Sequence, residues 1–560
     1  MLRRHMEATY ANTPQAVLCL RMKNVRHPGM VALATVTICS LLALGCRKES
    51  DRPTWDVDVL VPLVRTSFTI RDLVADSLVT TDPQGAVTLL YRSDLFKLEL
   101  DTLLLAPDTS FTYRYALPVT DSLNFPAGFN FFSQNDVQRF DLDEVALRKL
   151  VLREGRLELR MDNRVNSLVI GTLDLPGAIF PNGGTSMTTS VGAGTPANPT
   201  YSTAVRDLAG TSFDLRGPQF NDVNTLETSI GAMLEPPPQG QGAWVTADDS
   251  LVLSANYLGL VPQYARGYFG QRTVEAGPDT NDLTLFDALV AGTLDLDVAT
   301  LRLTVENGFG MDLQVRMRQL SAINTRTGNT VDLTHAIFQG PININRAIDL
   351  GSGFIASQYS NTIDVGNSNI DLFLENFPDQ VGYELDLELN PLGDISSGND
   401  FLYFESELKA GLELEVPLRL IANELTLQTI STPDLPGSAE GHALRSGELK
   451  LFATNGFPMS ARFELDLIDA NGEVIANIPV EGIAAPGVLG ANNLVTARTE
   501  SVLTATLSEE LVNILYAGAR LRSRVAFTTS DQSQHLRILD SYRMDLQITL
   551  AANYLVNGDE

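Results

Sequence analysis

The chain has 560 residues, a formal net charge of −28 and a hydrophobic content of 44%. This hydrophobic content is ordinary for a globular protein, so the acidity does not indicate a disordered chain. The excess of carboxylates repels nucleic acid, which is therefore excluded as an expected partner.

The first predicted element is a signal peptide at residues 1–45. Lys23 and Arg26 form a short basic region, and an apolar segment follows from Val31 to Leu44. This segment is too short to span a bilayer, which takes about 20 residues. Its length and its basic flank are instead typical of a signal-peptide core.

The apolar segment ends in Ala43-Leu44-Gly45-Cys46, which resembles the lipobox of bacterial lipoproteins. That pattern places Leu, Val or Ile three residues before the cysteine, whereas Ala43 and Leu44 stand here in the reverse order. The resemblance implies that Cys46 is acylated after cleavage, so the chain changes from soluble to membrane-anchored. The alternative is an ordinary signal peptide or a membrane anchor that happens to contain a cysteine.

The residues after Cys46 bear on the location of the mature chain. Arg47 stands where many lipoproteins of the inner membrane have Asp, and the charged run 47–51 resembles the export tag of surface lipoproteins in Bacteroidota. With the segment 55–58 soon after the cysteine, the chain also resembles large uncharacterised outer-membrane lipoproteins of Bacteroidota, a class that implies no activity. We expect an outer-membrane location, on the periplasmic side or at the cell surface.

Cysteine usage limits the possible chemistry. Of the three cysteines, Cys19 and Cys39 lie in the leader, so the mature chain would keep only Cys46. An internal disulfide, a cysteine metal site and a free thiol nucleophile are thereby excluded. The leader also contains five of the 40 basic and one of the 68 acidic residues, so the mature chain would carry a net charge of −32.

Alternation of apolar and polar residues dominates the mature chain. It is clearest at residues 157–161, 383–389 and 412–420, and a period of two predicts half-buried strands. The best helix candidate is 509–517, with Ser508 as its N-cap. The sequence therefore predicts an all-β fold of tandem β-sandwich-like repeat units of about a hundred residues, with few short helices.

A short segment recurs along the chain. Residues 301–311 align without gaps to 449–459, and 157–163 keep the same spacing from a first Leu to an Asn. The three asparagines are Asn163, Asn307 and Asn455. We interpret them as strand ends rather than a row of ligands, because Asn tolerates the backbone conformations of a turn. The segment resembles the strand motif of the water-stress/LEA type 2 β-sandwich family over a short stretch, which implies no function.

The repeats suggest a division of the chain into domains, with the true start expected at Met22. The expected segments are a signal peptide 1–45, a lipid anchor and tether 46–55, an N-terminal β region 56–150, and β repeat units 151–262, 263–395 and 396–560. Residues 183–203 and 235–242 are expected to be long loops because they are rich in Gly, Pro, Ser and Thr.

Aromatic residues near loops are the candidate ligand-binding residues. Trp244 follows the Pro-rich loop, and Tyr264, Tyr268 and Phe269 lie in a Gly-punctuated segment. Exposed aromatic clusters mark binding sites, and these rings are candidates for stacking on a ligand. Packing in the core is the alternative.

The sequence lacks the residue patterns of catalysis and metal binding. The histidines of the mature chain, His335, His442 and His535, are dispersed. Most acids alternate with apolar residues, as on solvated strand faces. Residues 469–473 resemble the start of a calcium loop, but a strand begins at Val474, so we predict a hairpin. We expect no catalytic residue, no metal and no cofactor.

These features favour a non-enzymatic binding or structural module of the cell envelope. It would be attached to the membrane by its N-terminal lipid, with an envelope protein or a glycan as its partner. The first alternative is a lipid or hydrophobic-ligand carrier, in which the sheets enclose an apolar cavity. The second is a carbohydrate-binding or carbohydrate-active protein.

Overall fold

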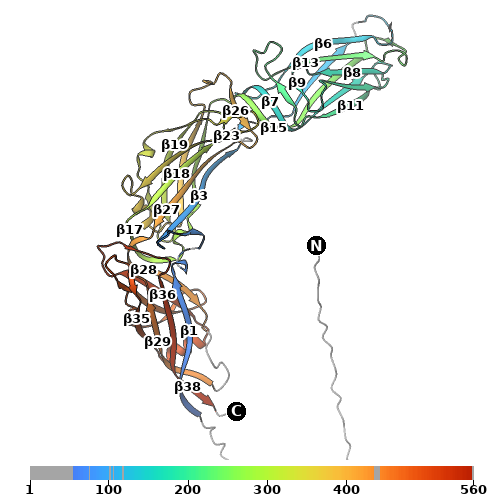
Figure 1. The fold of residues 1–560 in the computed structure, drawn as a ribbon. Helices are drawn as coiled ribbons and strands as arrows, with labels where there is room; N and C mark the ends of the chain where they lie inside the picture. The colour runs from blue at the N-terminus through green and yellow to red at the C-terminus, as the bar shows by residue number, and fades with distance from the viewer. Residues whose placement is uncertain are drawn as a thin grey trace, which may run out of the picture.

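The computed structural model describes residues 54–557, except 73, 75, 100–102, 105, 117–118 and 434–441. The described chain forms pairs of antiparallel sheets that follow one another along a curved rod (Figure 1), which confirms the all-β, sandwich-like fold. We name its parts the proximal, middle and distal sandwiches, starting from the end that contains both β1 and β38. The signal peptide and Cys46 lie outside the described residues. No helix within the described ranges has the length and apolar character needed to cross a membrane.

The proximal sandwich contains the first and last strands of the described chain. Its first sheet has the order β1 (Thr54–Thr69), β38 (Arg543–Asn557), β29 (His442–Asn455), β35 (Thr499–Leu507) and β32 (Val480–Glu481). Its second sheet has the order β17 (Leu289–Leu296), β28 (Arg419–Ser431), β36 (Arg520–Thr529), β30 (Met459–Ile468) and β31 (Val474–Ile478), with β37 (Leu536–Arg537) beside β28.

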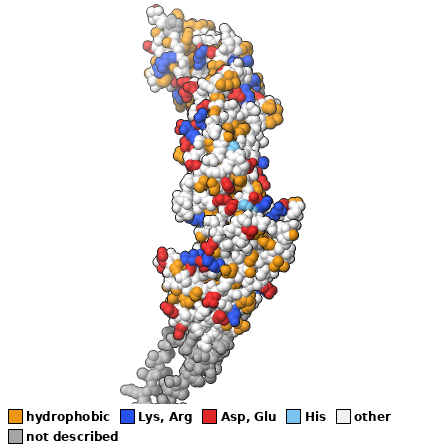
Figure 2. Space-filling model, turned by 90° about the vertical axis from the view of Figure 1, so that its left-hand side faces the viewer, with side chains coloured by type: hydrophobic (Ala, Val, Ile, Leu, Met, Phe, Trp, Pro, Cys, Tyr) orange, Lys and Arg blue, Asp and Glu red, His pale blue; other side chains and the backbone are white. Residues whose placement is uncertain are grey.

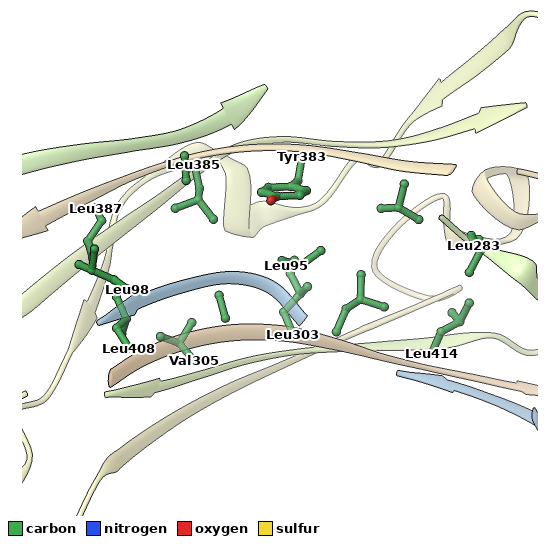
Figure 3. Close-up of a cluster of buried hydrophobic side chains, with 14 of the residues drawn as sticks. Leu95, Leu98, Leu283, Leu303, Val305, Tyr383, Leu385, Leu387, Leu408 and Leu414 are labelled. Carbon is green, nitrogen blue, oxygen red and sulfur yellow. The ribbon is translucent and has the colours of Figure 1, made fainter. Parts of the chain in front are cut away.

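The middle sandwich also has two sheets. One has the order β2 (Val79–Thr81), β3 (Val87–Glu99), β27 (Glu407–Pro417), β18 (Thr300–Asn307) and β24 (Ser357–Asp364). The other has the order β16 (Arg272–Asp282), β25 (Gln380–Leu389), β19 (Leu313–Asn324) and β20 (Asn329–Asp332), with β21 (Ile342–Ile344) beside β19. Leucines from β3, β18 and β27 face Tyr383, Leu385 and Leu387 of β25 across the core (Figure 3). The alternation in these strands therefore arises because one face of each sheet packs inward.

The distal sandwich is built around the two longest strands of the chain. Its larger sheet has the order β26 (Asp400–Tyr403), β15 (Ser250–Tyr268), β7 (Ala146–Asn163), β12 (Ser212–Asp214) and β9 (Ala178–Ile179), with β4 (Thr109–Ala116) beside β15 and β11 (Thr200–Asp207) beside β7. Its other sheets are β10 (Ser186–Val191), β8 (Val169–Asp174), β13 (Thr225–Leu234) and β6 (Asn130–Arg139), and the pair β5 (Leu123–Phe125) and β14 (Ala243–Val245).

Short elements complete the described chain. They are the hairpins β22 (Ile348–Asp349) with β23 (Phe354–Ile355) and β33 (Val488–Leu489) with β34 (Val495–Ala497), and the helices α3 (Ile370–Glu375) and α4 (Glu509–Tyr516). The described residues also form the 3-10 helices Ile70–Asp72, Asp76–Leu78, Thr284–Phe286 and Ala336–Gln339. Helix α4 confirms the predicted helix, and the Ser508 hydroxyl accepts a hydrogen bond from Leu511 N–H at 3.3 Å as its N-cap. The calcium-like segment is a hairpin, as predicted, because the Asp469 carboxylate accepts backbone N–H bonds from Asn471 and Glu473.

The chain runs along the rod and back more than once. It crosses from the middle to the distal sandwich between β3 and β4, between β15 and β16, and on either side of β26. It also crosses from the proximal to the middle sandwich, or back, between β1 and β2, on either side of β17, and between β27 and β28.

Strand pairing crosses the domain boundaries expected from the sequence, since β1 of the region 56–150 pairs with β38. Whether the expected segments fold by themselves stays a prediction.

One of the two loop predictions is wrong. Residues 183–203 contain β10 and the start of β11, because alternate residues of β10 (Met187, Thr189 and Val191) are buried and its backbone pairs with β8. The sequence did not indicate this strand, because the buried position 189 is a Thr and the alternation of apolar and polar residues is therefore interrupted. Residues 235–242 do connect β13 to β14 without a strand, as expected.

The recurring asparagines have the same structural role in each sandwich. Asn163, Asn307 and Asn455 are fully buried at the ends of β7, β18 and β29. Each carboxamide oxygen accepts the N–H of the residue two positions later, at 2.8 Å. Each carboxamide nitrogen donates to the carbonyl four positions later and to a carbonyl of a separate loop. The asparagines therefore tie strand ends together, and the structural interpretation is confirmed.

Candidate functional site

The face of the rod shown in Figure 2 does not present one dominant patch. Figure 2 shows acidic, basic and hydrophobic side chains intermixed over one face of the molecule. Interfaces and binding sites usually stand out as larger patches or as concave pockets. The clefts are therefore the places where convergent side chains can define a site.

A cleft with convergent side chains lies where the distal and middle sandwiches meet. It has a volume of about 730 Å³ and is lined from β7, β15, β26 and the β22–β23 hairpin. Its lining includes Lys149, Tyr264, Arg266, Asp349 and Tyr403. The volume falls in the range of small-molecule sites, about 300–1,000 Å³. We call it the tyrosine cleft.

Two tyrosines and one carboxylate organise the tyrosine cleft. Tyr264 and Tyr403 both donate hydroxyl hydrogen bonds to Asp349, at 2.8 and 2.7 Å, and their ring centres lie 4.8 Å apart. Phe354 stacks on Tyr403 at 5.6 Å. Strand pairing explains the arrangement, because Tyr264 of β15 lies directly opposite Tyr403 of β26. Directly opposed residues of an antiparallel pair share one face of the sheet.

The pKa values of these groups follow from the same contacts. Burial alone would raise the pKa of Asp349, but hydrogen bonds from Tyr403, from Gly351 N–H and from Tyr264 hold it below its ordinary value. Burial, together with the bond to Asp349, raises the pKa of Tyr403 to about 12 and raises that of Tyr264 as well. At neutral pH the phenols of Tyr264 and Tyr403 are therefore neutral, and the Asp349 carboxylate between them is ionised.

Replacing Asp349 by Ala is expected to lower the pKa of Tyr403 from about 12 towards its ordinary value of 10.0. Loss of the negative charge removes the repulsion that opposes the phenolate. Ultraviolet titration of tyrosinate in the native protein should then reveal additional ionisation between these two pH values. The exposed Asp248 provides a control, and Asp248→Ala should titrate like the wild type. Identical titration of Asp349→Ala and wild type would contradict the assignment.

A second cleft adjoins the first and has a different character. Its volume is about 450 Å³, and it shares Lys149 and Arg266 with the tyrosine cleft. Arg148 and Arg216 bring further positive charge, whereas Asp214 is the acidic residue of its lining. We call it the cationic cleft. The positive charge of this lining is unusual for this protein, because the chain as a whole is strongly acidic.

The four aromatic residues that were predicted to stack on a ligand lie in different environments. Tyr264 lines the tyrosine cleft, and Tyr268 is half-buried near the end of β15. Phe269 is 3% exposed and belongs to the core. Trp244 is 66% exposed on β14, outside both clefts. The structure thus does not gather these four residues into one site, and stacking by Trp244 stays a prediction.

Sequence reasoning missed most of the residues that line the clefts. Lys149, Asp349 and Tyr403 come from three segments that are widely separated in the sequence. The nearest signal was the adjacent pair of bases at 148–149, which sits among alternating strand residues. Residues 351–353 (Gly-Ser-Gly) also marked a turn, but nothing in the sequence placed that turn beside β15.

Other titratable clusters are accounted for by the fold. Within the described residues, no group of three or more potential ligands is arranged to hold a metal ion. His535 lies 2.9 Å from Asp295 and 3.9 Å from Asp297, all at the end of the second proximal sheet. Asp466 is 1% exposed and is surrounded by Arg522 and Arg524. Such pairing satisfies charges that strand packing has partly buried.

Comparisons with known proteins do not assign this chain to a family. No family model matches it, and no curated protein does. Among solved structures, an inferred secreted protein from Parabacteroides distasonis is 10% identical, with 89% of this chain and 99% of that chain covered and a TM-score of 0.24. A structure of infectious bursal disease virus, Gx strain, is 11% identical, with 88% and 85% covered and a TM-score of 0.10.

Proposed function

We propose that the protein is a lipid-anchored, non-enzymatic binding module that holds its distal sandwich away from the outer membrane. The position of β1 carries this proposal. Thr54 pairs with Asn557 in the proximal sandwich, and the distal sandwich lies at the opposite end of the rod (Figure 1). Thr54 follows Cys46 by eight residues, which span at most about 29 Å when fully extended. A lipid on Cys46 would therefore keep the proximal sandwich close to the membrane.

The path of the chain supports a role as a stiff spacer. A single flexible linker would let neighbouring domains reorient freely. Here each junction is crossed four times, for example on either side of β17 and of β26. Several covalent connections restrict bending more than one does. The rod thus suits a protein that presents a binding surface at a fixed distance from the membrane.

A carrier of lipid or other hydrophobic ligands is less well supported. The apolar cavity in the distal sandwich is lined by side chains such as Leu147, Phe213 and Tyr257, but its volume is only about 20 Å³. A cavity of that size holds about one water molecule. An acyl chain would have to displace packed core residues, which proteins resist because their interiors are close-packed.

A carbohydrate-active enzyme is also less well supported. Glycoside hydrolysis takes two facing carboxyl groups, one of which is kept protonated by a raised pKa. In the tyrosine cleft, the pKa of Asp349 is lowered, and both of its oxygens accept hydrogen bonds from Tyr264, Tyr403 and Gly351. Asp349 is therefore suited to fixing the two tyrosines rather than to donating a proton.

Replacement of Cys46 by Ala tests the anchoring. The variant is expected to lose its acyl groups and, where the apolar leader is still removed, to leave the membrane fraction. Fractionation of cells followed by immunoblotting measures this loss. Metabolic labelling with a fatty-acid analogue should mark the wild type and not the variant.

A leader cysteine offers the matched control for this experiment. Cys39→Ala makes the same chemical change seven residues earlier, within the expected signal peptide. It should remain labelled and membrane-bound. If Cys46→Ala still takes up the fatty-acid label, or if both variants behave alike, the anchoring proposal is wrong.

A further inference from the structure

A β-bulge in β7 directs two consecutive basic side chains into the cationic cleft. Lys149 lies opposite Arg266 of β15, but the next pair along the strands is Leu147 with Gly267. Arg148 is therefore an extra residue without an opposing partner. Successive side chains normally point to opposite faces of a strand, and a bulge can re-aim one of them. Both Arg148 and Lys149 consequently line the same cleft.

The guanidinium of Arg148 packs closely against the backbone of a neighbouring loop. A Cβ atom placed on Gly398 would lie 2.6 Å from Nε and 2.7 Å from Cζ of Arg148. These distances are too short for any real side chain. The absence of a side chain at Gly398 thus lets the guanidinium pack directly against the loop beside the cleft.

The cations of the cleft are incompletely neutralised within the protein. Lys149 and Arg266 are directly opposed, and like charges at opposed positions destabilise a sheet. Asp214 is opposed to Lys149 on the other side, but its carboxylate is bound in bidentate fashion by Arg216, at 2.9 and 2.6 Å. Arg266 donates to the neutral Asn399 at 2.8 Å, and its charge also acts on the Asp349 carboxylate of the tyrosine cleft. Lys149 Nζ lies 5.7 Å from the ring centre of Tyr264. An anionic ligand would supply the missing charge.

The connection to the tyrosine cleft narrows the choice of ligand. Lys149 and Arg266 line both clefts, so a ligand bound by these cations extends along the rings of Tyr264 and Tyr403. Sugar rings combine hydroxyl groups with apolar faces and match such a mixed surface. Polar side chains that can bond hydroxyls, Gln263 and Ser352 among them, also line this part.

Recognition of a peptide by strand addition is disfavoured at this place. Two edge strands of this sheet border the clefts. The Phe401 carbonyl of β26 already accepts a hydrogen bond from Gly310 N–H at 2.9 Å, and β9 comprises only the two residues Ala178–Ile179. Strand addition requires free backbone groups along an edge. Side chains must therefore provide the contacts, as they do for saccharides.

We propose that the joined cationic and tyrosine clefts bind an acidic saccharide, whose carboxylate or sulfate groups contact Arg148, Lys149 and Arg266 while a sugar ring lies against Tyr264. Arginine suits this task because its planar guanidinium pairs with carboxylate and sulfate oxygens. The inference deepens the proposed binding role. It does not require the membrane anchor, because the site lies at the junction of the distal and middle sandwiches, away from β1.

Isothermal titration calorimetry at low salt measures binding. The full-length chain is used, purified from whichever cell fraction contains it. The probes are an oligogalacturonate, a chondroitin sulfate oligosaccharide, a neutral maltooligosaccharide and poly-glutamate. The proposal expects at least one acidic saccharide to bind and the neutral one to bind more weakly. Added salt should weaken binding, since ionic contacts are screened. The two acidic probes distinguish carboxylate from sulfate as the recognised group.

Charge variants test the location of the site. Lys149→Gln combined with Arg266→Gln should weaken binding by about tenfold or more, as expected for the loss of charged hydrogen bonds. Arg302→Gln combined with Arg316→Gln makes the same change in net charge on exposed positions of the middle sandwich and should leave binding unchanged. Failure of both acidic saccharides to bind, or equal binding by the two double variants, overturns the proposal.

An aromatic variant separates a saccharide from an acidic peptide. Tyr264→Ala should weaken saccharide binding severalfold, whereas Tyr264→Phe keeps the ring and should bind nearly as the wild type does. If poly-glutamate binds as tightly as the acidic saccharides and Tyr264→Ala has no effect, the cleft recognises charge alone, and the saccharide assignment is wrong. None of these results depends on whether Cys46 is acylated, so failure of the anchoring proposal remains separately visible.

Discussion

Replacing Asn307 by Ala is expected to lower the free energy of unfolding of the middle sandwich by about 3–5 kcal/mol. The fully buried Asn307 carboxamide accepts from Phe309 N–H and donates to the carbonyls of Met311 and Asn345. Alanine leaves all three backbone groups without this partner, and each buried unsatisfied group costs about 1–3 kcal/mol. Denaturant unfolding followed by circular dichroism measures the change.

The same substitution at an exposed asparagine shows whether the loss of stability comes from the buried hydrogen bonds. Asn471 is exposed in the β30–β31 turn, and Asn471→Ala should change stability by no more than about 0.5 kcal/mol. Hydrogen exchange adds a spatial test, because Asn163→Ala and Asn455→Ala should increase exchange mainly in the distal and proximal sandwiches respectively. Equal stability of Asn307→Ala and Asn471→Ala would refute the structural role of the buried asparagines.

Replacing Asp466 by Asn is expected to destabilise the proximal sandwich by about 3 kcal/mol at neutral pH. Asp466 Oδ2 accepts from Arg522 at 2.6 Å and from Arg524 at 2.8 Å, while Asn477 bonds the other oxygen. Asparagine keeps the size but removes the charge, so Arg522 loses its carboxylate and Arg524 keeps only the more exposed Glu464. Thermal or denaturant unfolding measures the loss.

The pH dependence of this effect has a definite sign. Burial alone would raise the pKa of Asp466, but the hydrogen bonds from Arg522 and Asn477 and the charge of Arg524 hold it below the ordinary value of 3.8. A carboxyl group with a lowered folded-state pKa contributes stability above its unfolded-state pKa and loses it as the pH falls through the folded-state value. The difference between wild type and Asp466→Asn should therefore be constant at neutral pH and shrink below about pH 4.

Glu464 provides the control for Asp466. It lies two residues earlier on β30 and contacts Arg524 at 3.2 Å, but its side chain is 40% exposed. Exposed ion pairs contribute about 0–1 kcal/mol because water screens them. Glu464→Gln should therefore leave the free energy of unfolding nearly unchanged. If it lowers that free energy as much as Asp466→Asn does, burial is not the decisive factor.

The sequence by itself determined the elements and several of their ends. Alternation at 383–389 and 412–420 predicted strands, because a sheet with one buried face requires a period of two. Residues 383–389 lie within β25, whereas 412–420 include the end of β27, a break at Leu418 and the start of β28 in another sheet. Asn307 and Asn455 marked strand ends because Asn can bond its own backbone at a turn. Ser508 marked the start of α4 for a similar reason, since its hydroxyl completes the first turn. All of these signals act over a few residues.

Only the tertiary structure decided which strands pair and where a site forms. The pairing of β1 with β38 joins opposite ends of the chain, and alternation is equally compatible with other partners. The tyrosine cleft depends on Tyr264, Asp349 and Tyr403 meeting across a junction between two sandwiches. The cationic cleft depends on a bulge at Arg148, which shifts the register of β7 by one residue. Local sequence cannot specify these features, because they are fixed by the packing of segments that are distant along the chain.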